Sequence, residues 1–184
     1  MNKQISKNEI LDAAVAIAKE KGWEKTSVRD ISKMISYSTI KIYSEFGNKE
    51  GLLKMIQKRG FQMLKNEYLK SIETQDSSDQ KLIELTVKHF QFSKQHKVYY
   101  DLMFQMNGSP CPFPNGEVLR IAGKAVSELL SEVVGYSVNK VLFFNWWALA
   151  HGFIAITNAD KTEEEQAIIL LRAIMKNFVK GIKN

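Results

Sequence analysis

Hydrophobic residues recur along most of the chain at spacings of three and four, which is the period of amphipathic helices. No two alternating apolar runs are joined by an Asn-Gly or Asp-Gly turn, the usual signal of a β-hairpin. All three prolines fall within residues 110–114, so the rest of the chain is free to be helical. The pattern therefore predicts an all-α protein of about nine helices.

Polar caps and glycines in the amino-terminal third mark where short helices begin and end. Ser6–Glu9 and Ser27–Asp30 have the spacing of capping boxes, in which a serine and an acid three residues later satisfy each other's backbone groups. Gly22 is expected to end the first helix. Ser38 is expected to cap a third short helix, and Asn48 a long fourth one.

The long fourth helix is expected to run from Lys49 to about Ile72 and to link two domains. Further helices are expected at roughly 79–95, 97–106, 117–134, 138–158 and 162–182. The clearest loop covers residues 107–116. Three short helices followed by a long one predict a helix-turn-helix domain over residues 1–48 and a larger helical domain over residues 49–184.

Positive charge is concentrated where the helix-turn-helix is predicted. Residues 1–59 carry 12 lysines and arginines against 7 acidic residues, a net charge of +5, whereas residues 60–184 carry 14 against 13. A basic third on a nearly neutral body is typical of a protein that binds a polyanion, although a solvated lysine-rich surface gives the same numbers. Hydrophobic residues make up 45% and charged residues 25%, as in soluble globular proteins.

Several functional classes find no support in the sequence. The first residues show no secretory pattern, and no apolar run approaches the roughly 20 residues that span a bilayer. The single Cys111 suits a reducing cytoplasm, and His89, His96 and His151 lack the spacing of a metal site. No paired nucleophile and base, glycine-rich phosphate loop or HExxH motif is present. We expect a cytoplasmic protein that is not an enzyme and uses no metal, cofactor or membrane.

The amino-terminal residues also carry a resemblance to a known family. Residues in register over about 7–55 resemble the DNA-binding domain of the TetR family of transcriptional regulators: Ile10–Ala14, Gly22, Thr26–Ile31, Ser38, Tyr43, Phe46 and Asn48–Leu53. The resemblance implies a homodimer that binds double-stranded DNA and senses a ligand through its larger domain. A helical adaptor that does not bind DNA is the alternative.

The candidate DNA contacts follow from how a recognition helix enters the major groove. Its leading turn must carry side chains that read base edges, and here Lys41 could donate to guanine while Ile40 could touch a thymine methyl. Helix starts suit phosphates, and Tyr43 resembles the tyrosine that the family places on the DNA backbone. The full set is Thr26, Ser27, Arg29, Ser38, Thr39, Ile40, Lys41, Tyr43, Ser44 and Lys49.

Some of these residues have structural alternatives. Tyr43 could instead pack against Phe46, Lys49 could be an ordinary first-turn lysine, and Arg29 could pair with Asp30 or Glu50.

Three positions depart from the family's pattern. Ser36-Tyr37 stands where the turn usually carries Gly-Val, so Ser36 either accepts a positive φ or the turn is drawn differently. Ile40 replaces the usual glycine inside the recognition helix, and Glu45 adds a negative charge near the groove. These departures predict an affinity and an operator that differ from those of relatives.

In the larger domain, residues 145–155 resemble the Trp…His-Gly signature of one carboxy-terminal subgroup of the family, and residues 96–104 resemble a second segment of it. Aromatic and methionine side chains are abundant, which favours a pocket for a small apolar ligand. The candidate pocket residues are Phe92, Tyr100, Met103, Phe104, Phe144, Trp147 and His151. Plain core packing is the alternative for most of them, and a hydrogen-bonded interior position for His151.

The last two helices are apolar on nearly every side, so each needs two surfaces to bury against. One face closes the subunit's own core, and the resemblance implies that the other builds a four-helix dimer bundle. The candidate interface residues are Trp146, Leu149, Phe153, Leu171, Ile174 and Phe178. A larger monomeric core is the alternative. The expected function is a repressor that a ligand releases from a near-palindromic operator, although the sequence leaves repression or activation open.

Overall fold

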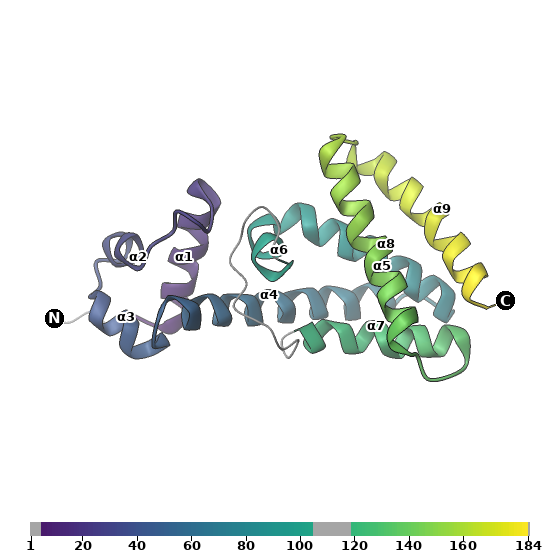
Figure 1. The fold of residues 1–184 in the computed structure, drawn as a ribbon, viewed down its shortest axis with the longest axis horizontal. Coiled ribbons are helices and arrows are strands. Elements are labelled where there is room, and N and C mark those ends of the chain that lie inside the picture. The colour runs from purple at the N-terminus through teal and green to yellow at the C-terminus, as the bar shows by residue number, and fades with distance from the viewer. Residues whose placement is uncertain (1–4, 105–118, 184) are drawn as a thin grey trace. The chain divides into compact units, whose positions relative to one another are not determined.

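The computed structural model describes residues 5–104 and 119–183, and these residues form α-helices joined by turns, with no strand among them (Figure 1). The helices are α1 (Lys7–Lys21), α2 (Val28–Met34), α3 (Thr39–Phe46), α4 (Lys49–Ile72), α5 (Ser78–Gln95), α6 (Lys97–Phe104), α7 (Leu119–Val134), α8 (Lys140–Ala159) and α9 (Glu164–Ile182). The predicted all-α fold is confirmed. The loop expected over residues 107–116 lies outside the described residues.

The expected caps form hydrogen bonds at three of the first four helix starts. The Ser6 amide donates to the Glu9 carboxylate at 2.7 Å, and the Glu9 amide donates to the Ser6 hydroxyl at 3.2 Å. Ser27 and Asp30 form the same reciprocal pair, and the Gly51 amide donates to the Asn48 side chain at 2.8 Å. Because such bonds join residues three apart, the sequence alone could locate these ends.

The helix-turn-helix does not form a compact unit by itself. Among the described residues, the structure groups 5–61 with 96–104, so that α1, α2, α3, the first half of α4 and α6 belong together. The Trp23 indole donates to the Val98 carbonyl at 2.8 Å, and the Gln57 amide donates to the Leu102 carbonyl at 2.7 Å. Helix α6 is therefore attached to the amino-terminal helices, whereas the sequence placed it with the larger domain.

Gly60 allows α6 to approach α4 closely within this unit. A Cβ at that position would lie 2.5 Å from the Met103 sulfur and 3.2 Å from the Tyr99 ring, distances that packed atoms do not tolerate. The missing side chain thus creates the space that Met103 occupies.

The second unit comprises residues 62–95 and 119–184, and α5 is its central helix. Helices α7, α8 and α9 all pack against α5 (Figure 1). The Trp146 indole on α8 donates to the Thr86 hydroxyl on α5 at 2.9 Å. Arg172 on α9 forms an ion pair with Glu84 on α5, and Lys183 pairs with Asp79 at 2.6 Å. Both faces of α5 are consequently buried.

None of the helices within the described segments is long and apolar enough to span a membrane.

Candidate nucleic-acid interface

One buried residue determines which face α3 presents outward. Ile42 is only 1% exposed and anchors the helix in the domain core. An α-helix turns 100° per residue, so side chains two positions before and after Ile42 lie on the opposite face. These are Ile40 and Ser44, which are both exposed, and Ile40 is 78% exposed. Lys41 and Tyr43 lie at the sides of that face and are exposed too.

Some polar groups on this face already have intramolecular partners. The Lys41 amine lies 5.3 Å from the centroid of the Tyr37 ring, a cation–π contact that holds it near the turn. The Ser44 hydroxyl donates to the Lys41 carbonyl at 2.8 Å and so points back to its own helix. Ser38 occupies the N-cap position, but its side chain makes no cap hydrogen bond, and that part of the prediction was wrong.

The turn between α2 and α3 contains a residue with a left-handed backbone conformation, and that residue is a serine rather than a glycine. Ser36 has a φ of +52°, so the first of the two alternatives expected from the sequence is correct. The Tyr37 amide donates to the Ser32 carbonyl at 3.0 Å, and the Ser32 hydroxyl donates to the Tyr37 carbonyl at 2.5 Å. These two bonds hold the turn that positions α3.

We expect Ser36→Gly to raise the stability of the free protein by about 1 kcal/mol, because glycine adopts this φ without the clash that a Cβ causes. Thermal unfolding without DNA measures the change. Ser38→Gly is the matched control, since Ser38 has a φ of −67° and no cap bond to relieve or lose. It should not stabilise the protein. An equal gain from both variants would contradict a strained Ser36.

Two candidates for phosphate contacts use their side chains inside the protein. Thr26 is buried and its hydroxyl donates to the Gly22 carbonyl at 2.8 Å. Ser27 is engaged with Asp30 in the capping box. A hydrogen bond from Lys21, followed by one from Ser27, lowers the pKa of Asp30 from 3.8 to about 2. The structure therefore favours structural roles for the side chains of Thr26 and Ser27.

The remaining cationic and tyrosine candidates have side chains that are at least partly accessible to solvent. Arg29 is exposed and forms no ion pair with any described residue, and its expected alternative partner Asp30 pairs with Lys21 instead. Tyr43 is 45% exposed rather than buried against Phe46. Lys49, the first residue of α4, and Thr39, the first residue of α3, are half-buried. Arg29 and Tyr43 are therefore accessible to solvent, and Thr39 and Lys49 partly so.

Glu45, which the sequence suggested would oppose DNA, has a partner. Lys7 on α1 lies 3.0 Å from its carboxylate, and both side chains are solvent-accessible. The pair offsets the negative charge beside α3, so Glu45 gives no reason to discard DNA binding.

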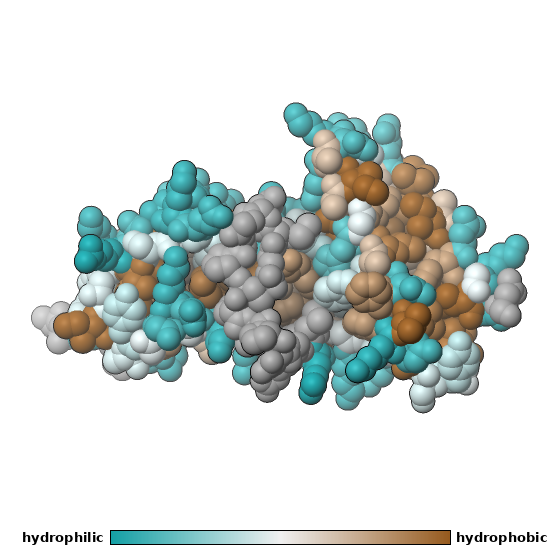
Figure 2. All heavy atoms as spheres, in the orientation of Figure 1, coloured by the Kyte–Doolittle hydropathy of each residue, from teal (hydrophilic) through white to brown (hydrophobic). Residues whose placement is uncertain are grey.

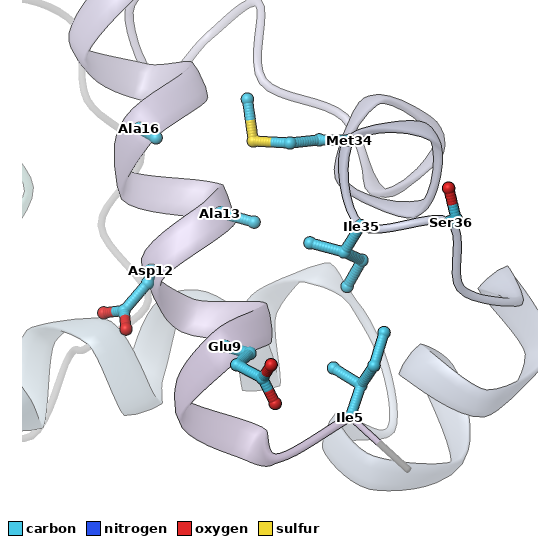
Figure 3. A pocket seen from close by; sticks show the side chains of 8 residues that line it. All are labelled: Ile5, Glu9, Asp12, Ala13, Ala16, Met34, Ile35 and Ser36. Carbon is cyan, nitrogen blue, oxygen red and sulfur yellow. The ribbon is translucent and has the colours of Figure 1, made fainter. Parts of the chain in front are cut away.

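An open groove of about 540 Å³ lies between α1 and the end of α2 (Figure 3). Its lining residues are Ile5, Glu9, Asp12, Ala13, Ala16, Met34, Ile35 and Ser36. Met34 and Ile35 point from the end of α2 toward α1. Glu9 caps α1, and Asp12 pairs with Arg59 at 2.5 Å. The two carboxylates that line the groove thus already have partners within the fold. None of the residues predicted to bind a ligand lines this groove.

Comparison with known families supports this interpretation of the amino-terminal unit. Residues 10–56 match the family described as bacterial regulatory proteins, tetR family. Over these residues the chain is similar to the DNA-binding domain of TetR-family transcriptional regulators. Regulators of that family bind DNA, in agreement with the DNA-binding role expected from the sequence.

Solved structures share the fold over nearly the whole chain. The transcriptional regulator FadR from Bacillus subtilis, solved with stearoyl-CoA, is 19% identical, with 96% of this chain and 99% of FadR covered and a TM-score of 0.75. The TetR-family regulator PfmR from Thermus thermophilus is 21% identical, with coverages of 93% and 97% and a TM-score of 0.66. The fatty acid degradation regulator FadR from Bacillus halodurans is 20% identical, with coverages of 95% and 96% and a TM-score of 0.69. No curated protein matches the sequence.

The predicted ligand residues of this chain fall into two groups. Tyr100, Met103 and Phe104 belong to the first unit, where the Tyr100 and Phe104 ring centroids lie 4.7 Å apart. Burial, and secondarily the charge of Asp101, raises the pKa of Tyr100, which therefore stays protonated. Phe92 is buried in the second unit. Phe144 lies on the surface of that unit rather than lining its interior, so the structure argues against its predicted place in a pocket.

Trp147 and His151 belong to a polar cluster inside the second unit, formed by Tyr68, His89, His151 and Trp147. The Tyr68 hydroxyl forms a short hydrogen bond with His89 Nδ1, and the His89 and His151 ring centroids lie 5.1 Å apart. The Trp147 ring lies 4.3 Å from the His151 ring. Burial, followed by the charge of His151, lowers the pKa of His89, and burial lowers the pKa of His151 to about 4. Both imidazoles are therefore neutral at physiological pH.

The sequence did not single out Tyr68 or His89 for this cluster, because their proximity depends on how α4 packs against α5. Among the described residues, no group of three or more histidine, cysteine or acidic side chains is placed to hold a metal ion.

The structure contradicts part of the predicted dimer interface on α8 and α9. Trp146, Phe153 and Leu171 are buried in the subunit's own core, whereas Leu149, Ile174 and Phe178 are partly exposed. Large apolar side chains lie instead on what we call the outer stripe: Val141, Phe144, Ile156, Ile169 and Leu170, all at least 51% exposed. Figure 2 shows apolar side chains gathered over α8 and α9.

Proposed function

We propose that this regulator is a homodimeric cytoplasmic repressor that binds a near-palindromic operator through α3 and leaves it when a small, largely apolar ligand binds the second unit. The observation that carries the DNA part is the outward face of α3. Ile42 anchors that helix, while Ile40, Lys41 and Tyr43 project from its exposed sides. Arg29, at the start of α2, adds a cation that forms no ion pair with the residues the structure describes.

The outer stripe supports the dimer. Single exposed apolar residues are common, but five large ones on two helices of one unit are more than a monomer usually exposes, and they suit a partner. Between the large side chains, α8 exposes Ala148 and Ala155, and a Cβ at Gly152 would meet no atom within 4 Å. Small residues let a second helix approach closely, so two copies can form a four-helix bundle.

The ligand part rests on the cluster of Tyr68, His89, His151 and Trp147. Aromatic rings and neutral imidazoles together suit a molecule that is mostly apolar and carries a group able to hydrogen-bond. Bacillus subtilis FadR, which shares the fold, was solved with stearoyl-CoA. We therefore propose long-chain acyl thioesters as the first ligands to test.

Helix α4 offers a route from ligand to DNA. Helix α4 contributes its first part to the first unit and its last part to the second. Tyr68 near the end of α4 bonds to His89, while Gln57 and Gly60 on the same helix contact α6. A ligand that prefers one arrangement of the Tyr68–His89 contact would shift α4 and, through it, the position of α3.

Fluorescence anisotropy with a labelled duplex tests the proposal. We expect binding that weakens about a thousandfold between 50 and 200 mM salt, as for a protein that neutralises several phosphates. Tyr43→Phe should weaken binding to all sequences alike by about tenfold, because one hydroxyl contact to a phosphate is lost in each subunit. Lys41→Ala should reduce the preference for the operator over unrelated DNA.

Tyr136→Phe is the matched control, since Tyr136 is an exposed tyrosine of the second unit and should not affect DNA binding. Stearoyl-CoA should release the operator, whereas CoA alone should not. Binding that ignores salt, or that both α3 variants leave unchanged, would refute DNA recognition by α3. Failure of stearoyl-CoA to release the operator would refute only this choice of ligand.

A further inference from the structure

We infer that Ile40 determines operator specificity by contacting the 5-methyl group of a thymine in each half-site. The inference rests on the proposed operator binding and deepens it by naming what the leading turn of α3 reads. Ile40 is 78% exposed, the highest value among the large apolar residues described as exposed. Its neighbour Ile42 is 1% exposed, so α3 is firmly oriented and Ile40 is held directly opposite the core.

The position of Ile40 along α3 places it where bases are read. It is the second residue of the helix, in the turn that leads into a major groove. Ser44 shares its face but lies one turn later, and the Ser44 hydroxyl donates to the Lys41 carbonyl. Ile40 is therefore the side chain that reaches furthest from the leading turn on the face opposite Ile42.

The polar neighbours of Ile40 lie away from the outward face of α3, so the contact that Ile40 can make with a base is apolar. Lys41 has its amine over the Tyr37 ring, to the side of the outward face. Thr39 is half-buried at the first position of α3. An isoleucine has neither donor nor acceptor, and the one apolar group in the major groove is the thymine methyl. The same methyl occurs on 5-methylcytosine.

Replacing thymine with deoxyuridine removes this methyl group and keeps every hydrogen-bonding group of the base. The preferred duplex is first selected from a random pool with the wild-type protein. Each thymine is then replaced in turn, in one or both half-sites. Burying one methyl group corresponds to about a fourfold change in affinity, so we expect about fourfold weaker binding at one position per half-site and more than tenfold for both.

Ile40→Ala should bind the thymine and deoxyuridine duplexes equally at that position while retaining the wild type's salt dependence. Met34→Ala is the matched control, because Met34 is also an exposed apolar residue of this unit but lies outside α3. It should keep the fourfold difference. A 5-methylcytosine·guanine pair at the same position should bind more tightly than the unmethylated pair.

Each outcome decides a separate question. If the protein selects a duplex but no thymine position discriminates against deoxyuridine, or if Ile40→Ala retains the discrimination, the inference fails and the proposed function stands. If Ile40→Ala alters the oligomeric state and not the thymine preference, Ile40 serves a protein contact. If the wild type binds no duplex even at low salt, the proposed function and the inference both fail.

Discussion

Phe144→Asp is expected to yield a folded monomer whose operator affinity is lower by at least a hundredfold. Phe144 is 65% exposed on α8, so its loss removes little from the subunit's own core. In a dimer built on the outer stripe, the aspartate would instead be buried on an apolar surface, where an unpaired charge is costly. A monomer engages one half-site at a time and loses the effective-concentration advantage of two linked recognition helices, typically 10²–10⁴.

Light scattering after size exclusion gives the mass, circular dichroism the helix content, and anisotropy the operator affinity. Tyr136→Asp is the matched control, because Tyr136 is an aromatic residue with a comparable exposure of 59% that lies between α7 and α8, off the outer stripe. It should remain dimeric. A dimer that survives Phe144→Asp would place the interface elsewhere, and a wild-type monomer at micromolar concentration would favour the larger monomeric core.

The parts of the fold that the sequence predicted best depend on local interactions. The starts of α1, α2 and α4 were located because Ser6, Ser27 and Asn48 bond to groups three residues away. Ser36 was identified as a strained position because a left-handed turn needs particular backbone angles whatever surrounds it. Ser38 shows the limit, since a capping residue at the right place formed no side-chain bond.

The sequence could not predict which side of α8 packs against the core, because that choice depends on tertiary packing. The helix has large apolar residues on two sides, and hydrophobicity does not say which side faces α5. The structure buries Trp146 where Thr86 can accept its indole proton and Phe153 where it meets Phe90. Ala148 and Gly152 on the other side were the available signal, because small residues favour close helix pairs between subunits.

The candidate DNA site also has one part that the sequence could predict and one part that it could not. Its location on α3 followed from the order of the helices, but the role of each side chain depended on its neighbours. Thr26 turned out to bond with Gly22, and Glu45 acquired Lys7 as a partner from α1. Neither contact can be inferred from sequence spacing, because hydroxyls and exposed charged side chains have many alternative partners.

Acidification from pH 7.5 to 5.5 is expected to destabilise the folded protein by about 2.7 kcal/mol through His89 and His151 together. Burial lowers the folded-state pKa of both groups, that of His151 to about 4. In the unfolded chain each titrates near 6.5, so below that pH the unfolded state binds protons that the folded state does not. Stability is therefore complete above pH 6.5 and is lost as the pH falls toward the folded-state values, by about 1.3 kcal/mol per histidine over this range.

Urea unfolding at several pH values between 7.5 and 5.5 measures this slope, and the range stays above the region where carboxylates titrate. His89→Gln and His151→Gln should each remove about half of the slope, whatever they do to absolute stability. His96→Gln is the control, since it removes an imidazole that lies in the first unit rather than in the cluster. Because the same two imidazoles face Tyr68 and Trp147, a ligand that binds them neutral should raise the stability of the folded protein at every pH in this range and leave the slope unchanged, since the slope arises from protons bound by the unfolded state. A slope that both cluster variants leave intact would mean that these histidines are already solvated and titrate normally in the folded protein.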